Sequence, residues 1–306
     1  MEPAGASTGA STGASTGASA ETSAGSLAAF SVDVEDYFQV EALRTFCPRA
    51  RWESFADRAV PGTERVLRLL DACGTKGTFF VLGWTAQRHP DLVRRIAAAG
   101  HEIASHGFDH ELVYHQEPED FRQDVRRARR LLQELSGQEV IGYRAPSYTI
   151  MARTLWALPI LAEEGYRYDS SIFPILRRRY GMPSAKRWPH RIDFDGGGSI
   201  VEFPLPTLRL GFINLPATGG AYLRLLPMGL QEWSVRGMLR GRRPFVLNIH
   251  PWELDPGQPR FAVNARTRWT HYHNLDQAED RVKALLSMAA FRSLAEVLRR
   301  SALLLD

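Results

Sequence analysis

The chain is poor in cysteine and has no long apolar run. Its 306 residues include two cysteines, Cys47 and Cys73, and neither lies in a Cys-x-x-Cys pattern. This excludes a disulfide framework and a paired-cysteine metal or redox motif. The longest clean apolar runs, such as residues 155–162, are far shorter than the roughly 20 residues of a membrane-spanning helix. An apolar content of 44% is nevertheless enough for a full-sized hydrophobic core.

The chain also lacks a strong excess of either charge. Lysine and arginine number 38 against 34 acidic residues, which gives a formal net charge of +4. Basic runs at residues 126–130, 177–179 and 240–243 have the charge to meet phosphates or anionic lipid headgroups. Since no aromatic residues interleave with them, nucleic acid is not an expected partner. Peripheral contact with a membrane-bound polymer assembly system stays open.

The first residues have a composition of low complexity. Residues 5–19 repeat Gly-Ala-Ser-Thr, and no large apolar residue lies between Met1 and Leu27. This composition predicts a disordered tail over residues 1–26. The segment lacks the basic start and apolar centre of a secretory signal peptide, so a cytoplasmic location is the default expectation.

From Leu27 onward, short β-rich runs alternate with helical patterns. One helical pattern runs from Pro61 to Gly74 and another from Pro118 to Gly137. Strands are predicted at 28–34, 78–82, 101–105, 140–143, 166–169, 200–203 and 245–249. This alternation predicts an α/β fold, a distorted (β/α) barrel of about seven parallel strands, with reactive residues at the carboxyl ends of the strands.

The C-terminal half is expected to contain more irregular structure. Residues 177–198 carry two prolines and three consecutive glycines, which predicts an irregular insertion. Residues 251–274 are similarly loop-like. Two helical segments, near residues 276–288 and 293–305, are expected to finish the chain.

Two polar clusters that follow predicted strands have the composition of a metal site. Strand alternation places Asp33 and Glu35 on one face, whereas Asp36 faces elsewhere unless the strand has ended. His106 and His110 are four residues apart, and on one helical turn both reach a single divalent cation. A carboxylate from the first cluster completes a His₂-carboxylate site of hydrolytic type. The alternatives are a turn or helix cap for the carboxylates and surface positions for the histidines.

Three further polar residues at strand ends are suited to proton transfer. Arg144 follows one strand and can hold a neighbouring carboxylate ionised through a bidentate contact. His250 follows another strand, and an imidazole that titrates near neutrality suits a general acid. Asp169 can orient His250 by accepting its ring hydrogen. Each has a purely structural alternative, but their convergence on one end of the predicted barrel indicates a site.

Five segments resemble motifs of the polysaccharide deacetylases of carbohydrate esterase family 4. They are SVDVEDYF (31–38), TFFVLGW (78–84), HEIASHGFDH (101–110), GYRAPSY (142–148) and NIHPWEL (248–254). The resemblance covers Leu27 to about Leu298 and implies one deacetylase domain over residues 27–306. Its C-terminal extension, from about residue 251, is similar to that of the exosortase-associated subgroup found in exopolysaccharide gene clusters.

The resemblance implies a role for each matched residue. The implied roles are catalytic base for Asp33, metal ligand for His106 and His110, support of the base for Arg144, tuning of the acid for Asp169, and the acid itself for His250. The first motif departs from the family, because the usual adjacent Asp-Asp pair becomes Asp-Val-Glu-Asp. Relatives with Asp-x-Asp favour Glu35 as the third metal ligand, and Asp36 is the alternative.

The expected function is metal-dependent removal of N-acetyl groups from an amino-sugar polysaccharide or its precursor, in exopolysaccharide biosynthesis. The bond cut is a linear amide, and the partner is an N-acetylated polysaccharide or oligosaccharide. Zinc is the expected metal, with cobalt, nickel and manganese as further options. Tyr148 and Trp252 are expected to bind the substrate by stacking on sugar rings. The other two interpretations are a hydrolase of a non-sugar cyclic amide and a non-catalytic carbohydrate-binding protein.

Overall fold

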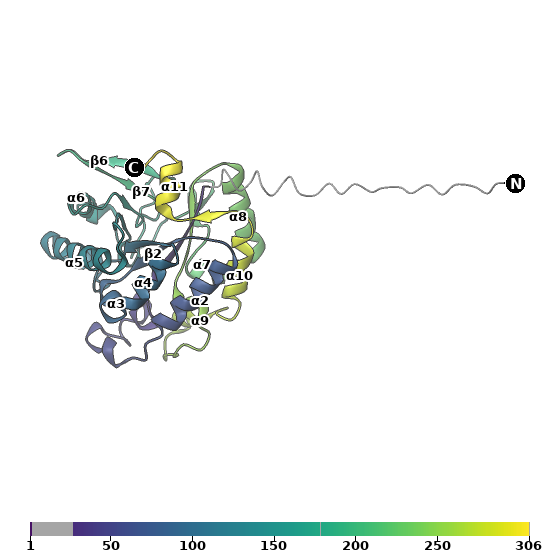
Figure 1. Cartoon of the computed structure of the whole chain (residues 1–306), viewed down its shortest axis with the longest axis horizontal. Helices are drawn as coiled ribbons and strands as arrows, with labels where there is room; N and C mark the ends of the chain where they lie inside the picture. The colour runs from purple at the N-terminus through teal and green to yellow at the C-terminus, as the bar shows by residue number, and fades with distance from the viewer. Residues whose placement is uncertain (2–26, 178, 306) are drawn as a thin grey trace.

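The fold is an α/β arrangement in which helices surround a curled, mostly parallel sheet (Figure 1). The computed structural model describes residue 1, residues 27–177 and residues 179–305. The tail predicted over residues 1–26 lies outside the described residues, except for residue 1. Among the described helices, none is both long enough and apolar enough to span a bilayer.

Seven of the nine described strands of the main sheet are the parallel strands that the sequence predicts. They are β1 (Ala28–Val34), β2 (Thr78–Val81), β3 (Glu102–Ser105), β4 (Gly142–Tyr143), β5 (Tyr168–Asp169), β7 (Ser199–Glu202) and β10 (Phe245–Ile249). Their order is β10-β1-β2-β3-β4-β5-β7, so the last of them in sequence returns to lie beside the first. All of these neighbouring pairs are parallel.

The sheet is open rather than closed. Strand β6 (His190–Asp193) adds to β7 in the antiparallel direction, and β11 (Phe291–Arg292) pairs with the start of β1. Within the described ranges, no pairing joins β6 or β7 to β10. The sheet is therefore a half-barrel, which agrees with the predicted distorted barrel.

Ten α-helices and several 3₁₀ turns connect the strands in the described chain. The α-helices are α2 (Ala59–Ala72), α3 (Gly83–Arg88), α4 (Pro90–Ala98), α5 (Pro118–Ser136), α6 (Ala157–Glu163), α7 (Ala221–Leu225), α8 (Met228–Arg240), α9 (Ala265–Tyr272), α10 (Ala278–Leu286) and α11 (Leu294–Arg300). The 3₁₀ turns are η1 (Tyr37–Gln39), η2 (Glu41–Leu43), η3 (Arg49–Ser54), η4 (Val113–His115), η5 (Pro146–Tyr148), η6 (Ala152–Thr154) and η7 (Pro251–Leu254).

Helix α5 has the boundaries that its sequence predicts. Pro118 stands in its first turn, where a missing N–H costs nothing, and Gly137 ends it with φ of 68°. Its buried residues recur every three or four positions, which places one apolar stripe against the sheet. They are Phe121, Val125, Ala128 and Leu132.

The predicted irregular insertion at residues 177–198 is corrected in part. Its last residues form β6, which pairs with β7 through the turn that contains Gly197 and Gly198. Both glycines have positive φ, which lets the chain reverse tightly there. The loop-like stretch at 251–274 also contains η7 and α9.

One hairpin that the sequence analysis did not identify stands apart from the main sheet. It consists of β8 (Thr207–Leu210) and β9 (Ile213–Pro216), joined by the two residues Gly211 and Phe212. The chain leaving it passes directly over β10, because Gly220 N donates to the Asn248 carbonyl at 2.9 Å. A Cβ on Gly219 would lie 3.0 Å from that carbonyl oxygen, so the close approach requires glycine.

The inside of the half-barrel is apolar at one end and polar at the other. On β1, alternation directs Ala29, Ser31 and Asp33 to the same face. Ala29 packs in a buried cluster with Phe80, and α11 closes this cluster at the amino end of the strands. Further along β1, Ser31 and Asp33 are buried polar residues. The carboxyl end of the barrel therefore holds a buried polar site.

Candidate active site

The predicted site residues lie at the carboxyl ends of the strands, as the barrel fold requires. Asp33 is the penultimate residue of β1, and Asp169 is the last residue of β5. His106, Arg144 and His250 each follow directly after a strand, which is β3, β4 and β10 respectively. The parallel order of these strands brings all five to one end of the sheet.

Glu35, His106 and His110 form a buried group with the composition of a metal site. Glu35 Oε1 lies 2.8 Å from His106 Nε2 and 3.1 Å from His110 Nε2. One ligand atom from each residue lies within 4.8 Å of the others, and all three side chains are buried. This geometry fits a divalent cation held by two imidazoles and one carboxylate.

The backbone fixes the orientation of His106. Its Nδ1 lies 2.8 Å from the carbonyl oxygen of Arg144, which can only accept a hydrogen bond. A neutral His106 ring bound to a cation would keep its proton on Nδ1 and would offer Nε2 as the ligand atom. Metal-binding imidazoles are commonly held in this way.

The two histidines do not share a helical turn, which corrects the sequence-based expectation. Residues 106–112 form an irregular loop in which Gly107 and His110 have φ of 75° and 57°. A left-handed histidine is uncommon, and it turns the His110 ring back toward Glu35. The two Nε2 atoms thus converge through loop geometry rather than helical periodicity.

Electrostatics hold Glu35 in its charged form. Burial alone would raise the pKa of Glu35, but nearby His110 and hydrogen bonds from His106 and His110 lower that pKa well below its ordinary value. A carboxylate in this state is an anionic ligand ready for a cation.

Asp36 is not part of this group, so it is corrected as a candidate ligand. Its Oδ1 accepts from the Tyr37 backbone N–H at 2.7 Å, and its Oδ2 accepts from the N–H groups of Arg58 and Ala59. Asp36 is the N-cap of η1 and also ties η1 to the start of α2. Burial raises the pKa of Asp36 to about 7. Its oxygens are used by the backbone and do not face the histidines.

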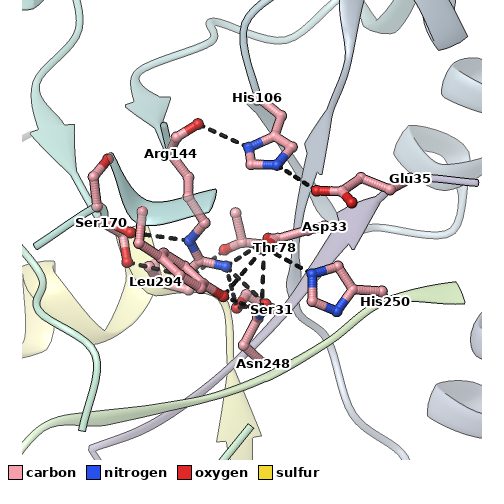
Figure 2. A network of polar contacts seen from close by, with 12 residues as sticks. Ser31, Asp33, Glu35, Thr78, His106, Arg144, Ser170, Asn248, His250 and Leu294 are labelled. Atoms are coloured by element: carbon pink, nitrogen blue, oxygen red, sulfur yellow. Dashed lines mark hydrogen bonds and ion pairs between the residues drawn. The ribbon is translucent and has the colours of Figure 1, made fainter. Parts of the chain in front are cut away.

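Asp33 lies at the centre of a buried hydrogen-bond network (Figure 2). Its Oδ1 accepts from Arg144 Nη1 at 2.6 Å. Its Oδ2 accepts from Asn248 Nδ2 at 3.1 Å and lies 3.6 Å from His250 Nε2. Arg144 Nη1 also donates to Ser31 Oγ and Asn248 Oδ1. The guanidinium is therefore fixed on several sides and holds the carboxylate in one position.

His250 is oriented by Glu253, one turn further along η7. His250 Nδ1 lies 3.0 Å from Glu253 Oε2, and Glu253 Oε1 accepts from Arg224 Nε at 2.9 Å. Burial would lower the pKa of His250, but Glu253 and the acidic groups Glu35 and Asp33 raise it to about 9. Burial would raise the pKa of Glu253, yet Arg224 and His250 lower it to about 2. These charges favour a protonated His250.

Asp169 does not contact His250, so its predicted role as orienting carboxylate is wrong. Its Oδ1 accepts from Ser171 Oγ, and the β5–β7 register places it opposite Glu202. Burial raises the pKa of Asp169 and of Glu202. A hydrogen bond with Glu202 offsets part of this rise for Asp169, whereas Asp169 raises the pKa of Glu202 further. Asp169 is a structural member of the barrel interior, and Glu253 takes the position beside His250.

The two predicted sugar-stacking residues have different surroundings. The Tyr148 hydroxyl accepts from Asn248 Nδ2 at 2.7 Å and donates to Asp33 Oδ2 at 3.4 Å, so Tyr148 lies in the site. Trp252 is only 8% exposed, and its ring stacks on His250 and on His271. Trp252 therefore supports His250 from within the core, which corrects the expectation that it stacks on a sugar.

Several residues that build the site were missed by sequence reasoning. Ser31 and Asn248 each interrupt an apolar strand two residues before a predicted site residue, and that interruption is a usable signal. Glu253 follows His250 at the spacing of one 3₁₀ turn. Arg224 and Glu202 carry no local signal, because only the folded chain brings them to the site.

A small cavity borders the group formed by Glu35, His106 and His110, and a larger cavity adjoins it. One reaches His110 and is also lined by Phe38, Trp52 and Asp109. It shares Arg44 and Arg49 with a cavity of about 620 Å³ that extends toward α9. The cavity beside His110 has a volume of about 20 Å³, which is room for roughly one water molecule.

Two consecutive stretches of the chain match known protein families. A model of the polysaccharide deacetylase family matches residues 48–168, and a domain of unknown function, DUF3473, matches residues 170–299. Peptidoglycan deacetylase-like protein FGM2 of Gibberella zeae is 32% identical over 167 residues, 53% of this chain and 47% of the relative. A peptidoglycan-N-acetylglucosamine deacetylase of Bacillus cereus is 31% identical over 96 residues, 31% of this chain and 35% of the relative. The chain thus spans less than half of these curated relatives.

Solved structures share the fold across nearly the whole chain. A crystal structure from Mycobacterium smegmatis, assigned as a polysaccharide deacetylase, has a TM-score of 0.60 and 23% identity over 90% of each chain. The allantoinase Puue has a TM-score of 0.61 and 16% identity over 94% of each chain. The fold of the chain is thus a deacetylase-like α/β half-barrel. Residues 48–168 therefore resemble polysaccharide deacetylases, and residues 170–299 resemble a DUF3473 domain.

Proposed function

We propose that this protein is a metal-dependent hydrolase that removes N-acetyl groups from an amino-sugar polysaccharide or its precursor. The observation that carries the proposal is the buried group Glu35, His106 and His110 beside Asp33. Asp33 is held by Arg144 on one side and approached by His250 on another (Figure 2). Metal ligands, base and acid are the components that amide hydrolysis requires.

The side chains fit a divalent cation, and zinc is the first choice. Two imidazoles and a carboxylate are the ligand set of hydrolytic zinc sites, although cobalt, nickel and manganese also accept it. When bound, such a cation acidifies water and polarises a carbonyl oxygen. Glu35, His106 and His110 would hold it, while the Arg144 carbonyl keeps the His106 ring in place.

The proposed proton transfers use Asp33 and His250. Asp33 accepts a proton from the attacking water, and Arg144 keeps its carboxylate oriented for this step. Protonated His250 donates its Nε2 proton to the departing sugar nitrogen, while Glu253 holds Nδ1. The Ser147 backbone N–H is the proposed donor to the oxyanion, because the neighbouring Tyr148 N–H already donates to the Ala145 carbonyl. The products are acetate and a free amino sugar.

The proposed setting is exopolysaccharide biosynthesis. Its support is the resemblance of the segment after Pro251 to the extension of the exosortase-associated subgroup. Curated relatives include a chitooligosaccharide deacetylase of Rhizobium leguminosarum bv. trifolii, which is 48% identical over 48 residues, 16% of this chain and 22% of that protein. A polymer of N-acetylated amino sugars is the substrate class that this resemblance supports.

The test is acetate release from N-acetylglucosamine oligomers by the full chain after metal has been stripped. Activity should return with zinc or cobalt, and an Asp33→Asn variant should stay inactive although it still binds metal. A cyclic amide offered in parallel tests the other hydrolase interpretation through ring opening. Acetate release that does not depend on metal, or that survives in Asp33→Asn, would overturn the proposal.

A further inference from the structure

The tip of the β8–β9 hairpin exposes several large apolar side chains. Leu210, Phe212 and Ile213 are 70%, 101% and 63% exposed, and Leu215 is 44% exposed. They sit on a tight two-residue turn in which Gly211 has φ of 58°. Turns of this kind normally carry polar residues. No side chain in the described ranges covers Phe212, so this apolar tip has no partner within the fold.

The segments of sequence around the hairpin carry arginines and no acidic residue. Neither residues 170–192 nor residues 203–231 include any Asp or Glu. At the hairpin, Arg209 Nε donates to the Gly211 carbonyl, which holds its guanidinium at the tip. Arg187 donates to Thr207 at the base of the hairpin. Arg177 is exposed and reaches the Tyr222 hydroxyl, just beyond β9.

We propose that the β8–β9 hairpin docks on an anionic lipid bilayer. Leu210, Phe212 and Ile213 enter the boundary between headgroups and acyl chains, while Arg209 and neighbouring arginines meet lipid phosphates. Apolar side chains flanked by arginines, without acidic residues, are the combination that binds anionic membrane surfaces. A narrow protruding tip enters a fluid bilayer readily, whereas a protein partner of ordinary size needs a broad complementary face.

The residues that follow the hairpin connect it to the candidate active site. The chain after β9 is tied to β10 through Gly220 N and the Asn248 carbonyl, and Asn248 contacts Asp33. A Cβ on Gly220 would lie 3.9 Å from the His250 ring. Docking would therefore hold the protein on lipid through an element that a few residues connect to the site. The inference does not depend on the proposed deacetylase activity, because lipid binding is measured without turnover.

The first experiment is cosedimentation of the full chain with vesicles. One set contains phosphatidylcholine alone, and the other contains phosphatidylcholine mixed with phosphatidylglycerol. The unaltered protein should bind the mixed vesicles preferentially. The triple change Leu210→Ser, Phe212→Ser and Ile213→Ser should reduce the partition coefficient about tenfold or more. Arg209→Gln should reduce it about fivefold, since one basic residue near the surface is removed.

A matched control comes from the opposite end of the barrel. Leu305 is 75% exposed, and its carbonyl accepts from Arg167, which precedes β5 at the amino end of the strands. Leu305→Ser removes an equally exposed apolar side chain and should leave vesicle binding unchanged. Because all of these side chains are exposed, the variants should fold, and circular dichroism checks this.

A second measurement reports insertion directly. An environment-sensitive fluorophore is attached at Phe212→Cys in a Cys73→Ser background, because Cys73 is exposed while Cys47 is buried. Its emission should shift to the blue with mixed vesicles, whereas the same label at Leu305→Cys should not shift. Two results would each overturn the proposal: no vesicle binding by the unaltered protein, or full binding by the triple variant. If the unaltered protein does not bind vesicles and the triple variant changes self-association, the hairpin is a contact between copies of the chain.

Discussion

Arg144 and Asp33 form an ion pair of 2.6 Å in which both side chains are buried. The guanidinium makes further hydrogen bonds to Ser31 and Asn248 and to both the carbonyl and the hydroxyl of Ser170. A buried pair of this kind is costly to break, because removing one partner leaves the other charge without compensation.

Replacing Arg144 should therefore destabilise the protein as well as inactivate it. Arg144→Met is expected to lower the free energy of unfolding by about 3–5 kcal/mol, since Asp33 stays buried without a counter-charge. Chemical denaturation measures this change. The double variant Arg144→Met with Asp33→Leu should recover much of the loss. Arg44→Met, which breaks an exposed pair with Glu111, should cost about 1 kcal/mol or less.

Loss of His106 should remove both metal and activity. His106→Ala deletes one of three converging ligand atoms, so metal affinity should fall by more than about 100-fold, and turnover should fall with it. Metal content after dialysis and acetate release measure the two effects. His115→Ala is the control, because this exposed histidine contacts Glu111 and lies outside the group. A His106→Ala protein that keeps its metal and full activity would refute the ligand assignment.

Glu253 and Asp169 should respond differently to removal of their charges. Glu253→Gln keeps the shape but weakens the hold on protonated His250, so kcat should fall about 10- to 100-fold with KM nearly unchanged. Asp169→Asn should leave kcat within about threefold of the original value, because Asp169 contacts Ser171 rather than His250. Steady-state kinetics with the same oligomer compares them. The opposite ranking would restore Asp169 as the residue that orients the acid.

His101 should contribute to acid sensitivity. Burial first, and then nearby Lys76, lower the pKa of His101 to about 4, and its Nδ1 accepts from the Gly77 N–H. An unfolded histidine has a pKa of about 6.5, so the unfolded chain binds this proton first. The contribution of neutral His101 to the free energy of unfolding is therefore complete above about pH 6.5. It is lost as the pH falls toward 4, and the free energy of unfolding decreases by about 3 kcal/mol at most.

The check is urea unfolding at neutral and at mildly acidic pH. His101→Gln should flatten the fall in unfolding free energy between about pH 6.5 and 4. His115→Gln, which changes an exposed histidine, should leave the fall as it is. Equal pH dependence in His101→Gln and the unaltered protein would contradict the assignment.

The strands were predictable because apolar runs between polar residues mark them. The bounds of β1 and β10 agree with the predicted ranges 28–34 and 245–249. Strands β4 and β5 are shorter than predicted. Apolar periodicity identifies buried residues, but it does not show which of them form hydrogen bonds to a neighbouring strand. The β8–β9 hairpin was missed because its apolar residues face outward, against the usual rule.

The site was predictable where it depends on strand ends and not where it depends on turns or distant partners. Glu35 and Asp36 differ because the Glu35 N–H bonds back to the Asp33 carbonyl, a turn that no spacing rule specifies. Asp169 was assigned to His250 by family pattern, but strand register sets it opposite Glu202. Arg224 reaches Glu253 only after the chain has folded back on itself.

Strand β10 comes from the C-terminal part of the chain and pairs with β1, so the residues of the site come from two separate stretches of the sequence. The family match at residues 48–168 contains His106, His110 and Arg144, whereas the DUF3473 match at 170–299 contains His250 and its support from Glu253 and Arg224. Recombination between relatives near residue 169 would exchange His250, Glu253 and Arg224 together. Glu35, His106 and His110 would be inherited separately, so the two halves of the site can diverge while sharing one sheet.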